Sequence, residues 1–467
     1  MLTKHPGVQN GHTLIMTQGR PSSLMTRFAV PVFLSQLFQQ FYNTADSLIV
    51  GRFLGTEALA AVSSSGTLIF LMISFFNGVT MGAGVVIGRW FGAGNEDKVS
   101  RAIHTDIAVG LTSGTLLTVL GMLFTPALLR MMNTDPSVMP KAQEYFFYYF
   151  SGGLALVMYN TFKDIMNALG DSKRPLYYLI FSSLFNIGAD LLFIGVFRWG
   201  VWSAAAATVL SQLLSCVLCL MHLTKKDEIY SVSLRKIRFS RDMLREILRM
   251  GLPSGVQNSV IALANVTVQS QINLFGANAT AGYGAYSKLE GFAFLPITSF
   301  NMAITTFVSQ NLGAGLHDRA KKGARFGILC AMVLAEMTGL ILYILAPQLI
   351  GLFDPSEEVI RFGVTQARNV TLFYFLLAFS HAVASVCRGA GKAFVPMLVM
   401  LGVWCVIRVI YIMLMMHFFG EIVLVYRAYP ITWSISSVIY LIYYLKSDWI
   451  NGFGPSGQSR TKAKTER

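Results

Sequence analysis

The sequence has few charged residues for its length, and this shortage excludes an ordinary soluble protein. Charged side chains make up 13% of the 467 residues, whereas hydrophobic side chains make up 54%. A typical soluble domain carries about twice that share of charge. Apolar stretches of about 20 residues recur along the whole chain, and each is long enough to cross a bilayer as a helix.

The chain also lacks the motifs of common enzymes. It contains no nucleotide-binding P-loop, no HExxH metal motif and no Gly-rich loop after a strand. No nucleophile is paired with a base, so we expect a protein that is not an enzyme and that needs no cofactor. Cysteine is scarce, with five residues, and Cys216 and Cys219 form a lone CxxC within an apolar run. This setting favours packing over zinc or redox chemistry.

Residues 1–22 contain no apolar core of the kind that a signal peptide needs, so we expect no cleavable signal. Both Met1 and Met16 are candidate start residues.

We predict an all-α integral membrane protein with twelve transmembrane helices. Helices are expected because lipid cannot satisfy an open backbone, and the segments lack the short alternation of a membrane barrel. The predicted spans are 28–51, 58–83, 104–126, 143–161, 175–196, 200–223, 254–276, 284–309, 326–350, 366–386, 396–418 and 428–446.

The sequence contains an internal repeat, with an offset of 221 or 222 residues between its two copies. Three pairs of motifs carry this repeat: "RFAVP" and "RMGLP", "FGAGNEDK" and "LGAGLHDR", and "ALGDSKRP" and "GAGKAFVP". Because each repeat holds an even number of spans, the two halves have the same orientation in the membrane. The sequence therefore predicts two six-helix lobes related by a pseudo-two-fold axis along the membrane normal.

The distribution of lysine and arginine sets the expected orientation. With both termini in the cytoplasm, the inside loops hold most of the cations, and this bias accounts for the net charge of +14 without a nucleic-acid partner. We expect a monomer in the cytoplasmic membrane. The predicted parts are a cytoplasmic tail (1–22), an N-lobe (23–223), a cytoplasmic linker (224–248) that ends in an amphipathic surface helix, a C-lobe (249–447) and a basic cytoplasmic tail (448–467).

Acidic residues at membrane depth are concentrated in the first half. Asp46 lies in the first span and Asp190 in the fifth, and their counterparts in the second half are Thr267 or Val268 and Tyr411. An ionisable side chain at the helix centre costs about 2.5–3.5 kcal/mol, so such residues mark functional sites. Without a nearby lysine or arginine in the sequence, a proton, a sodium ion or a positively charged substrate must neutralise them.

Further polar residues share helix faces with these acids. Gln36, Gln39 and Asn43 continue the line of Asp46 along the first span, and Asn186 precedes Asp190 by one turn. Such residues also join helices through hydrogen bonds, and for each of the three first-span residues this structural role and a substrate cavity stay open.

In the second half, Glu290 is either an interfacial charge or a cavity residue that binds cations. Arg408 is expected to pair with an acid or with backbone carbonyls, and His381 and Asn265 are expected to pack or to hydrogen-bond. Gly78 and Gly82, like Gly84 and Gly88, have the spacing of close helix packing.

With these motifs, and with "NTADSLIVGRFLG", the chain resembles the multidrug and toxic compound extrusion (MATE) family, in its bacterial DinF/MepA-like branch. The resemblance covers about residues 23–446. It implies that Asp46 is the coupling carboxylate and that Asn186, Asp190 and Thr208 complete a site for H⁺ or Na⁺. It also implies that Pro31 bends the first helix. The span-seven glutamate of the NorM-type branch is absent from "NVTVQSQINLFG", so no second cation site is expected in the C-lobe.

The function that follows is a secondary active antiporter that exports cationic or amphipathic compounds across the cytoplasmic membrane in exchange for H⁺ or Na⁺. The alternative is a flippase for lipid-linked precursors, which shares this architecture but needs a basic cavity.

Overall fold

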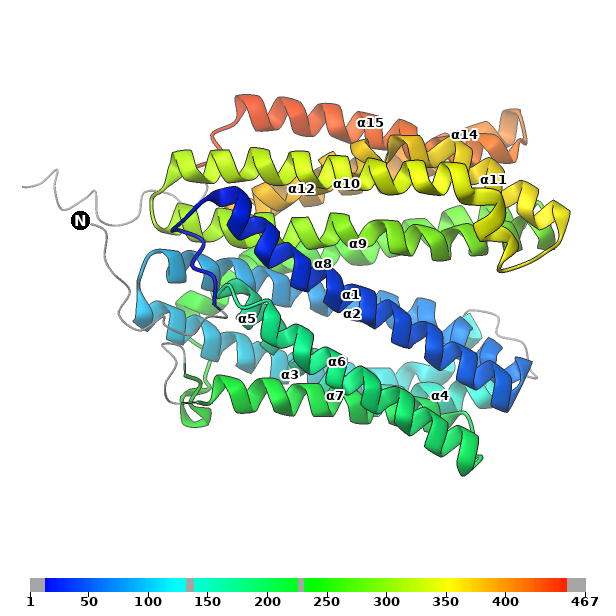
Figure 1. The fold of residues 1–467 in the computed structure, drawn as a ribbon, viewed down its shortest axis with the longest axis horizontal. Coiled ribbons are helices and arrows are strands. Elements are labelled where there is room, and N and C mark those ends of the chain that lie inside the picture. Colours follow the sequence, from blue (N-terminus) through cyan, green and yellow to red (C-terminus); the bar gives the residue numbers. More distant parts are fainter. Residues whose placement is uncertain (1–12, 132–137, 226–230, 452–467) are drawn as a thin grey trace, which may run out of the picture. The chain divides into compact units, whose positions relative to one another are not determined.

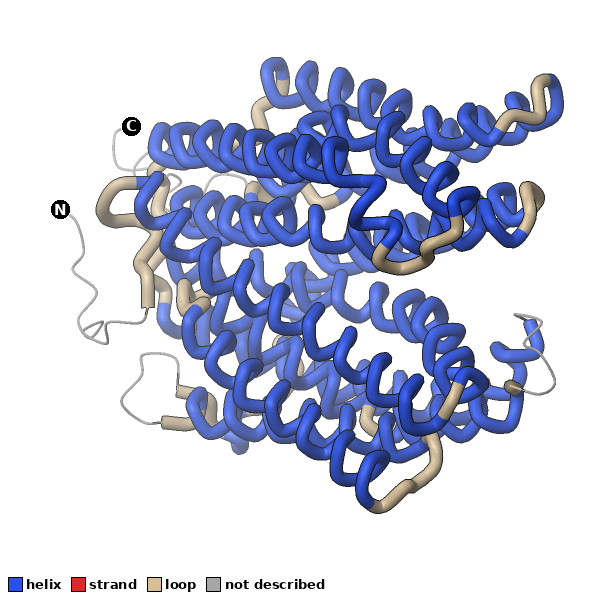
Figure 2. The backbone as a smooth tube through the Cα atoms, turned by 45° about the vertical axis from the view of Figure 1, so that its right-hand side comes forward, coloured by secondary structure: helices blue, strands red, loops and turns tan. Residues whose placement is uncertain are grey.

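The computed structural model describes residues 13–131, 138–225 and 231–451, and every regular element in these ranges is helical (Figure 1). Short loops join the helices, as the tube in Figure 2 shows. The predicted tail residues Arg460, Lys462, Lys464 and Arg467 lie outside the described ranges, as do residues 1–12 and part of the linker. The first half contains α1 (Pro21–Leu54), α2 (Thr56–Gly92), α3 (Glu96–Met131), α4 (Met139–Ser151), α5 (Gly153–Ala168), α6 (Lys173–Asp190), the π-helical η1 (Leu191–Val196) and α7 (Trp202–Leu223).

The second half begins after the short η2 (Leu234–Lys236) and repeats the pattern. Its elements are α8 (Arg241–Asn273), α9 (Ala277–Gly313), α10 (His317–Gly351), α11 (Glu357–Val370), η3 (Thr371–Phe373), α12 (Tyr374–Gly389), α13 (Phe394–Met400), the π-helical η4 (Leu401–Ile407), α14 (Arg408–Phe418) and α15 (Ile422–Lys446).

Each predicted span falls on one helix or on a run of two or three consecutive helical elements. Among the described residues, nine helices are long and apolar enough to cross a membrane. The other three predicted spans correspond to α1, α4 with α5, and α8. α4 and α5 have 13 and 16 residues and are each too short to cross a membrane alone. α1 carries the glutamines and Asp46, and α8 starts with the charged run at Arg241.

The internal repeat produces the same turns in both halves. Gly94 and Gly315 close the "GAG" turns after α2 and α9 with φ values of 67° and 72°. Gly170 and Gly391 follow α5 and α12 with φ values of 92° and 80°. Positive φ is accessible to glycine at little cost, so the repeated glycines fix equivalent chain reversals.

The chain forms two compact units that exchange short segments. Among the described residues, the first unit contains 13–15 and 27–262, and the second contains 16–26 and 263–451. α1 therefore changes unit between Thr26 and Arg27, one turn before Pro31, and α8 changes unit between Ala262 and Leu263. The lobe limits at 223 and 249 stay a prediction from the repeat.

Within the first unit, α2 and α8 meet backbone to backbone through glycine. A Cβ atom added to Gly78 would lie 2.3 Å from the Gly255 nitrogen, and one added to Gly82 would lie 2.3 Å from the Gly251 nitrogen. The predicted close packing at Gly78 and Gly82 is therefore present, and its partner is a second pair of glycines four residues apart.

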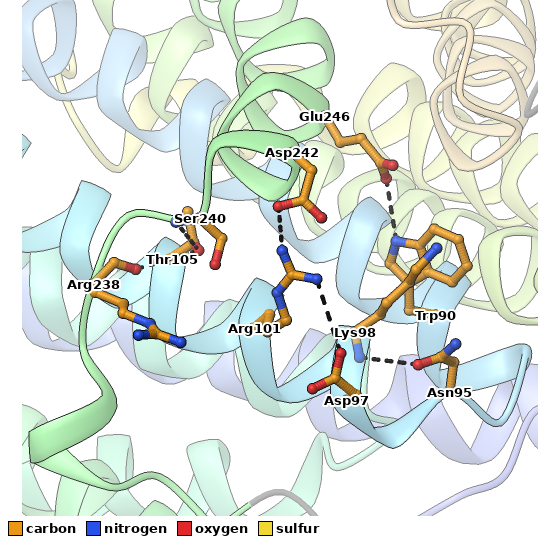
Figure 3. A network of polar contacts seen from close by, with 10 residues as sticks. All are labelled: Trp90, Asn95, Asp97, Lys98, Arg101, Thr105, Arg238, Ser240, Asp242 and Glu246. Atoms are coloured by element: carbon orange, nitrogen blue, oxygen red, sulfur yellow. Dashed lines mark hydrogen bonds and ion pairs between the residues drawn. The ribbon is translucent and has the colours of Figure 1, made fainter.

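A polar network joins the start of α8 to the last turn of α2 and the first turns of α3 (Figure 3). Arg101 forms ion pairs with Asp97 and Asp242. The indole nitrogen of Trp90 donates a 3.2 Å hydrogen bond to Glu246, and the Lys98 ammonium lies 3.7 Å from the Trp90 ring centroid. The predicted surface helix at the end of the linker is therefore the first part of α8 and is held against α2 and α3.

Candidate functional site

Asp46 and Asp190 come together inside the first unit. Asp46 lies two turns before the end of α1 and is 9% exposed, and Asp190 is the last residue of α6 and is fully buried. The two carboxyl groups are close enough to interact directly. Within the described residues, neither Asp190 oxygen has a hydrogen-bond partner by strict geometry, and the same holds for Asp46 Oδ1.

The backbone changes form at Asp190. α6 ends there, and the chain continues as the π-helical segment η1. π-Helical turns are rare and recur at functional sites because the extra residue turns neighbouring side chains. The C-lobe has its own π-helical segment, η4, which ends directly before Arg408. Each lobe thus places a π-helical turn beside its buried charge.

Asn186 of α6 and Thr208 of α7, the other predicted members of the site, are both buried. Asn186 is one turn before Asp190 on the same face and is fully buried, and its amide has no partner among the described residues. Thr208 is 9% exposed and lies one turn before Gln212. Carboxylate, amide and hydroxyl oxygens are the atoms that accept a proton or coordinate a hard cation.

Several groups that the sequence prediction omitted also belong to this neighbourhood. Tyr42 lies one turn before Asp46 and is close to the side chains of Gln39 and Gln212. Tyr145 and Tyr149 of α4 lie within electrostatic range of Asp46. Tyrosine counts as apolar in a hydropathy pattern, so only the packing reveals these hydroxyls.

An apolar cluster closes one side of the acid pair. It is built from the last turns of α1, from α2, α4 and η1, and from the start of α7; its buried members are Ile49, Val50, Ala58, Val62, Tyr145, Ile194, Val201, Ala204 and Ala205. Excluding water in this way strengthens every charge interaction at the acids.

Pro31 lies in the first third of α1, which continues through it. Proline removes one backbone hydrogen bond of the helix, and the Ser35 hydroxyl donates a 2.9 Å hydrogen bond to the Pro31 carbonyl. Of the first-span polar residues, Gln36 and Gln39 are partly buried and Asn43 is exposed. Their assignment to a substrate cavity stays a prediction.

The second unit buries a cation directly after its π-helical segment η4. Arg408 is 2% exposed, and its Nε and Nη2 atoms donate hydrogen bonds of 3.2 and 3.0 Å to the Thr432 hydroxyl. Its guanidinium carbon lies 4.6 Å from the Tyr429 ring centroid and 5.3 Å from that of Trp404. Thr432, two aromatic rings and the nearby charge of Glu290 therefore hold Arg408.

Glu290 of α9 is partly buried and lies close to Tyr374, whose hydroxyl is 2.8 Å from that of Tyr286. His381 packs edge-on against Phe294 and Trp404. Asn265 is exposed. The C-lobe thus contains a tyrosine-rich network around one acid and one cation, whereas the N-lobe pairs two acids.

Comparison with known proteins identifies the family. The MatE family model matches the chain twice, at residues 31–192 and 253–414. The chain belongs to the MatE family. The two matches are displaced by 222 residues at both ends, which confirms the internal repeat and its offset.

Similar proteins share nearly the whole length of this MatE chain. The probable multidrug resistance protein YoeA of Bacillus subtilis is 28% identical over 90% of this chain and 92% of its own. The multidrug export protein MepA of Staphylococcus aureus is 20% identical over 83% of this chain and 86% of its own. These relatives confirm the predicted resemblance.

A solved structure has the same fold. It is described as the outward-facing conformation of a multidrug resistance MATE family transporter of the MOP superfamily, and it superposes with a TM-score of 0.89 at 22% identity. The match covers 95% of this chain and 99% of the other. The predicted class, an all-α, two-lobe, multi-pass membrane protein, is thus confirmed.

Proposed function

We propose that this chain is a secondary active transporter that exports cationic or amphipathic compounds across the cytoplasmic membrane in exchange for H⁺ or Na⁺. The family and the multidrug resistance proteins among its relatives support export as the activity. One observation supports the coupling: Asp46 and Asp190 face each other, buried, within one lobe.

The pair has a simple chemical consequence. Two carboxylates in a site of low polarity cannot both stay ionised without a positive partner. No lysine or arginine is among the groups that act on either acid within the described residues. A proton or a sodium ion from outside supplies that charge, with Asn186 and Thr208 as additional donors. The same charge balance disfavours a bound cationic compound while the ion is in place.

Ion binding must then change the shape of α1. Asp46 lies on α1 four turns beyond Pro31, and a helix that lacks one hydrogen bond at a proline bends at low cost. Drawing Asp46 toward Asp190 bends α1 at Pro31 and displaces the compound. No resident cofactor is needed for this cycle, and H⁺ or Na⁺ is a substrate of the exchange.

The energetics limit the coupling. When one monovalent cation enters as one monovalent drug leaves, the membrane potential contributes nothing, because the two charge movements cancel. A tenfold ion gradient then supplies about 1.4 kcal/mol, which supports about a tenfold drug gradient. For a neutral compound, the potential adds about 2.3 kcal/mol per 100 mV.

The flippase alternative is less well supported by the charges. A cavity for a lipid-linked pyrophosphate needs several accessible cations, whereas Arg408 is 2% exposed and is already held by Thr432 and the aromatic rings. The buried acids of the N-lobe, Asp46 and Asp190, would repel a pyrophosphate.

The test is drug export by the protein in liposomes with an imposed pH or Na⁺ gradient. Wild type should export ethidium against its gradient, and Asp46→Asn should abolish export while the protein stays folded. Asp97→Asn is the matched control, because the Asp97 side chain is 79% exposed, and it should export like wild type. Wild-type export by Asp46→Asn would refute the proposal.

A further inference from the structure

A second pair of acids lies in the first unit, away from Asp46 and Asp190. Asp106 of α3 is fully buried, and neither of its carboxyl oxygens has a hydrogen-bond partner among the described residues. Asp164 of α5 is partly buried and acts electrostatically on Asp106. The coupling site described above does not explain why these two aspartates are enclosed in the protein.

Close packing of α3 on α5 brings these acids together. A Cβ atom added to Gly110 would lie 2.7 Å from the Thr161 hydroxyl. Asp106 is one turn before Gly110, and Asp164 is one turn after Thr161, so each acid shares a face with its helix contact.

Two further polar groups complete the cluster. The Thr80 hydroxyl of α2 is 3.0 Å from Asp164 Oδ2. Asn167 of α5 lies three residues beyond Asp164, on the same side of the helix; it is 5% exposed, and its Oδ1 atom has no partner within the described part of the chain. An unpaired amide at this depth is an independent sign that the cluster holds something.

The charges around the two acids indicate what kind of group the cluster binds. Asp164 is the charged group that acts on Asp106, and the charged and titratable groups near Asp164 are Lys163 and Tyr159, both on α5. Lys163 is the single cation among them, and its ammonium is 2.8 Å from the Asn160 side-chain oxygen. Two carboxylates against one ammonium leave one negative charge, which one monovalent cation neutralises.

The geometry at Thr80 fits a proton. The Thr80 hydroxyl is also 3.1 Å from the Asn77 carbonyl oxygen, and a hydroxyl has only one proton to donate. When Asp164 is ionised, Thr80 donates to it. When Asp164 is protonated, it donates to Thr80, which donates to Asn77 instead. Both states are fully hydrogen-bonded at this position.

The cluster lies at the other end of the lobe from the coupling site. Asp164 is four residues from the end of α5, or about 6 Å, whereas Asp190 is 17 residues from the start of α6, or about 26 Å. The short turn between α5 and α6 places these two ends at the same, predicted cytoplasmic side. The acid pairs are therefore separated by about 20 Å along the helices.

Tyrosine hydroxyls occupy the interval between the two pairs. Tyr42 lies within electrostatic range of Asp46, and Tyr159 lies within range of both Tyr42 and Asp164. Tyr42 and Tyr159 are 7% and 3% exposed. A hydroxyl both donates and accepts, so it passes a proton on without keeping a charge.

We propose that Asp106 and Asp164, together with Thr80, form a second cation site, which receives one proton from the Asp46–Asp190 pair through Tyr42 and Tyr159 and releases it at the cytoplasmic end of the N-lobe. The proton leaves a carboxyl group of the first pair and ends on a carboxylate of the second, so no bond other than O–H changes. The site itself stands without the proposed export function, and its role as an exit rests on that function.

Infrared spectroscopy of protonated carboxyl groups in the purified protein tests the site directly. In the Asp46→Asn, Asp190→Asn double variant, a pH-sensitive carboxyl signal should persist, and adding Asp106→Asn and Asp164→Asn should remove the part of it that these two acids contribute, leaving the part of other enclosed acids such as Glu290. These changes remove buried charge with little change in size. Equal carboxyl signals in the double and the quadruple variant would overturn the site. Displacement of the signal by Na⁺ at constant pH would overturn its assignment to a proton.

Transport in liposomes tests the role as an exit. Tyr159→Phe should lose most of the drug-export rate while the drug affinity stays at the wild-type value, and the infrared signals of both acid pairs should remain. Tyr177→Phe, at a position 54% exposed on α6, is the matched control and should export normally. Normal export by Tyr159→Phe would overturn the path. If wild type exports no drug while the second carboxyl signal persists, the proposed function fails and the site stands.

Discussion

Replacing Gly78 with alanine should loosen the contact between α2 and α8. The new Cβ atom would lie 2.3 Å from the Gly255 nitrogen and 2.4 Å from its Cα, whereas normal contact needs about 3.5 Å or more. Because the obstacle is backbone, α8 must move by about 1 Å. Overpacking of this kind lowers stability by about 1–3 kcal/mol, and we expect a clear loss of thermal stability in detergent.

The matched control is Gly284→Ala in α9, where a Cβ atom would meet no atom within 4 Å. There, alanine should leave stability unchanged or raise it by up to about 1 kcal/mol through its helix propensity. Combining Gly78→Ala with Gly82→Ala should cost less than the sum of the single changes, since α8 has already moved. Equal melting temperatures for Gly78→Ala and Gly284→Ala would refute the packing described for this contact.

The other predictions concern the proline, the buried arginine and the ionic network. Pro31→Ala restores a helix hydrogen bond, so it should raise stability by up to about 3 kcal/mol and reduce export; a stabilised and fully active variant would contradict the hinge. Arg408→Met should lower the unfolding free energy by about 3 kcal/mol, whereas Thr432→Val should lower it by about 1 kcal/mol. Equal losses for the two variants in denaturant titrations would argue against the contacts between Arg408 and the aromatic rings. Asp242→Asn removes a half-exposed ion pair with Arg101, so it should cost less than about 1 kcal/mol; a loss that does not shrink in high salt would be inconsistent with this pair.

The sequence was sufficient for the helices and the repeat because both are local patterns. Apolar length predicts each span, and the repeated glycines Gly94 and Gly315 adopt the same turn. Asp46 and Asp190 were predictable as a pair because charge is rare at membrane depth, and the structure brings them together. Their roles, and those of Asn186 and Thr208, remain predictions.

The second acid pair was missed for a physical reason. Asp106 lies near the start of the predicted span 104–126, and Asp164 lies just beyond the predicted span 143–161. A charge near the end of an apolar run is normally taken to face the membrane surface. Only the packing of α3 on α5, set by Gly110, shows that these helices continue and enclose the acids.

For a similar reason, the sequence did not predict that α8 is one continuous helix. The sequence predicted a surface helix at the end of the linker (224–248) and a separate span that begins at residue 254. The structure keeps one helix through Pro253 because Gly251 and Gly255 press its first part against α2. Tertiary contact, rather than local preference, decides the conformation there.

The central claim is that one cation and the exported compound compete for the buried Asp46–Asp190 pair. The most direct test is the drug dissociation constant of the purified protein, measured as H⁺ or Na⁺ is varied at fixed ionic strength. We predict that affinity falls tenfold for each tenfold rise in the coupling ion once that ion exceeds its own dissociation constant, and that the dependence disappears in the Asp46→Asn, Asp190→Asn double variant. A wild-type dissociation constant that responds to neither ion would contradict the account.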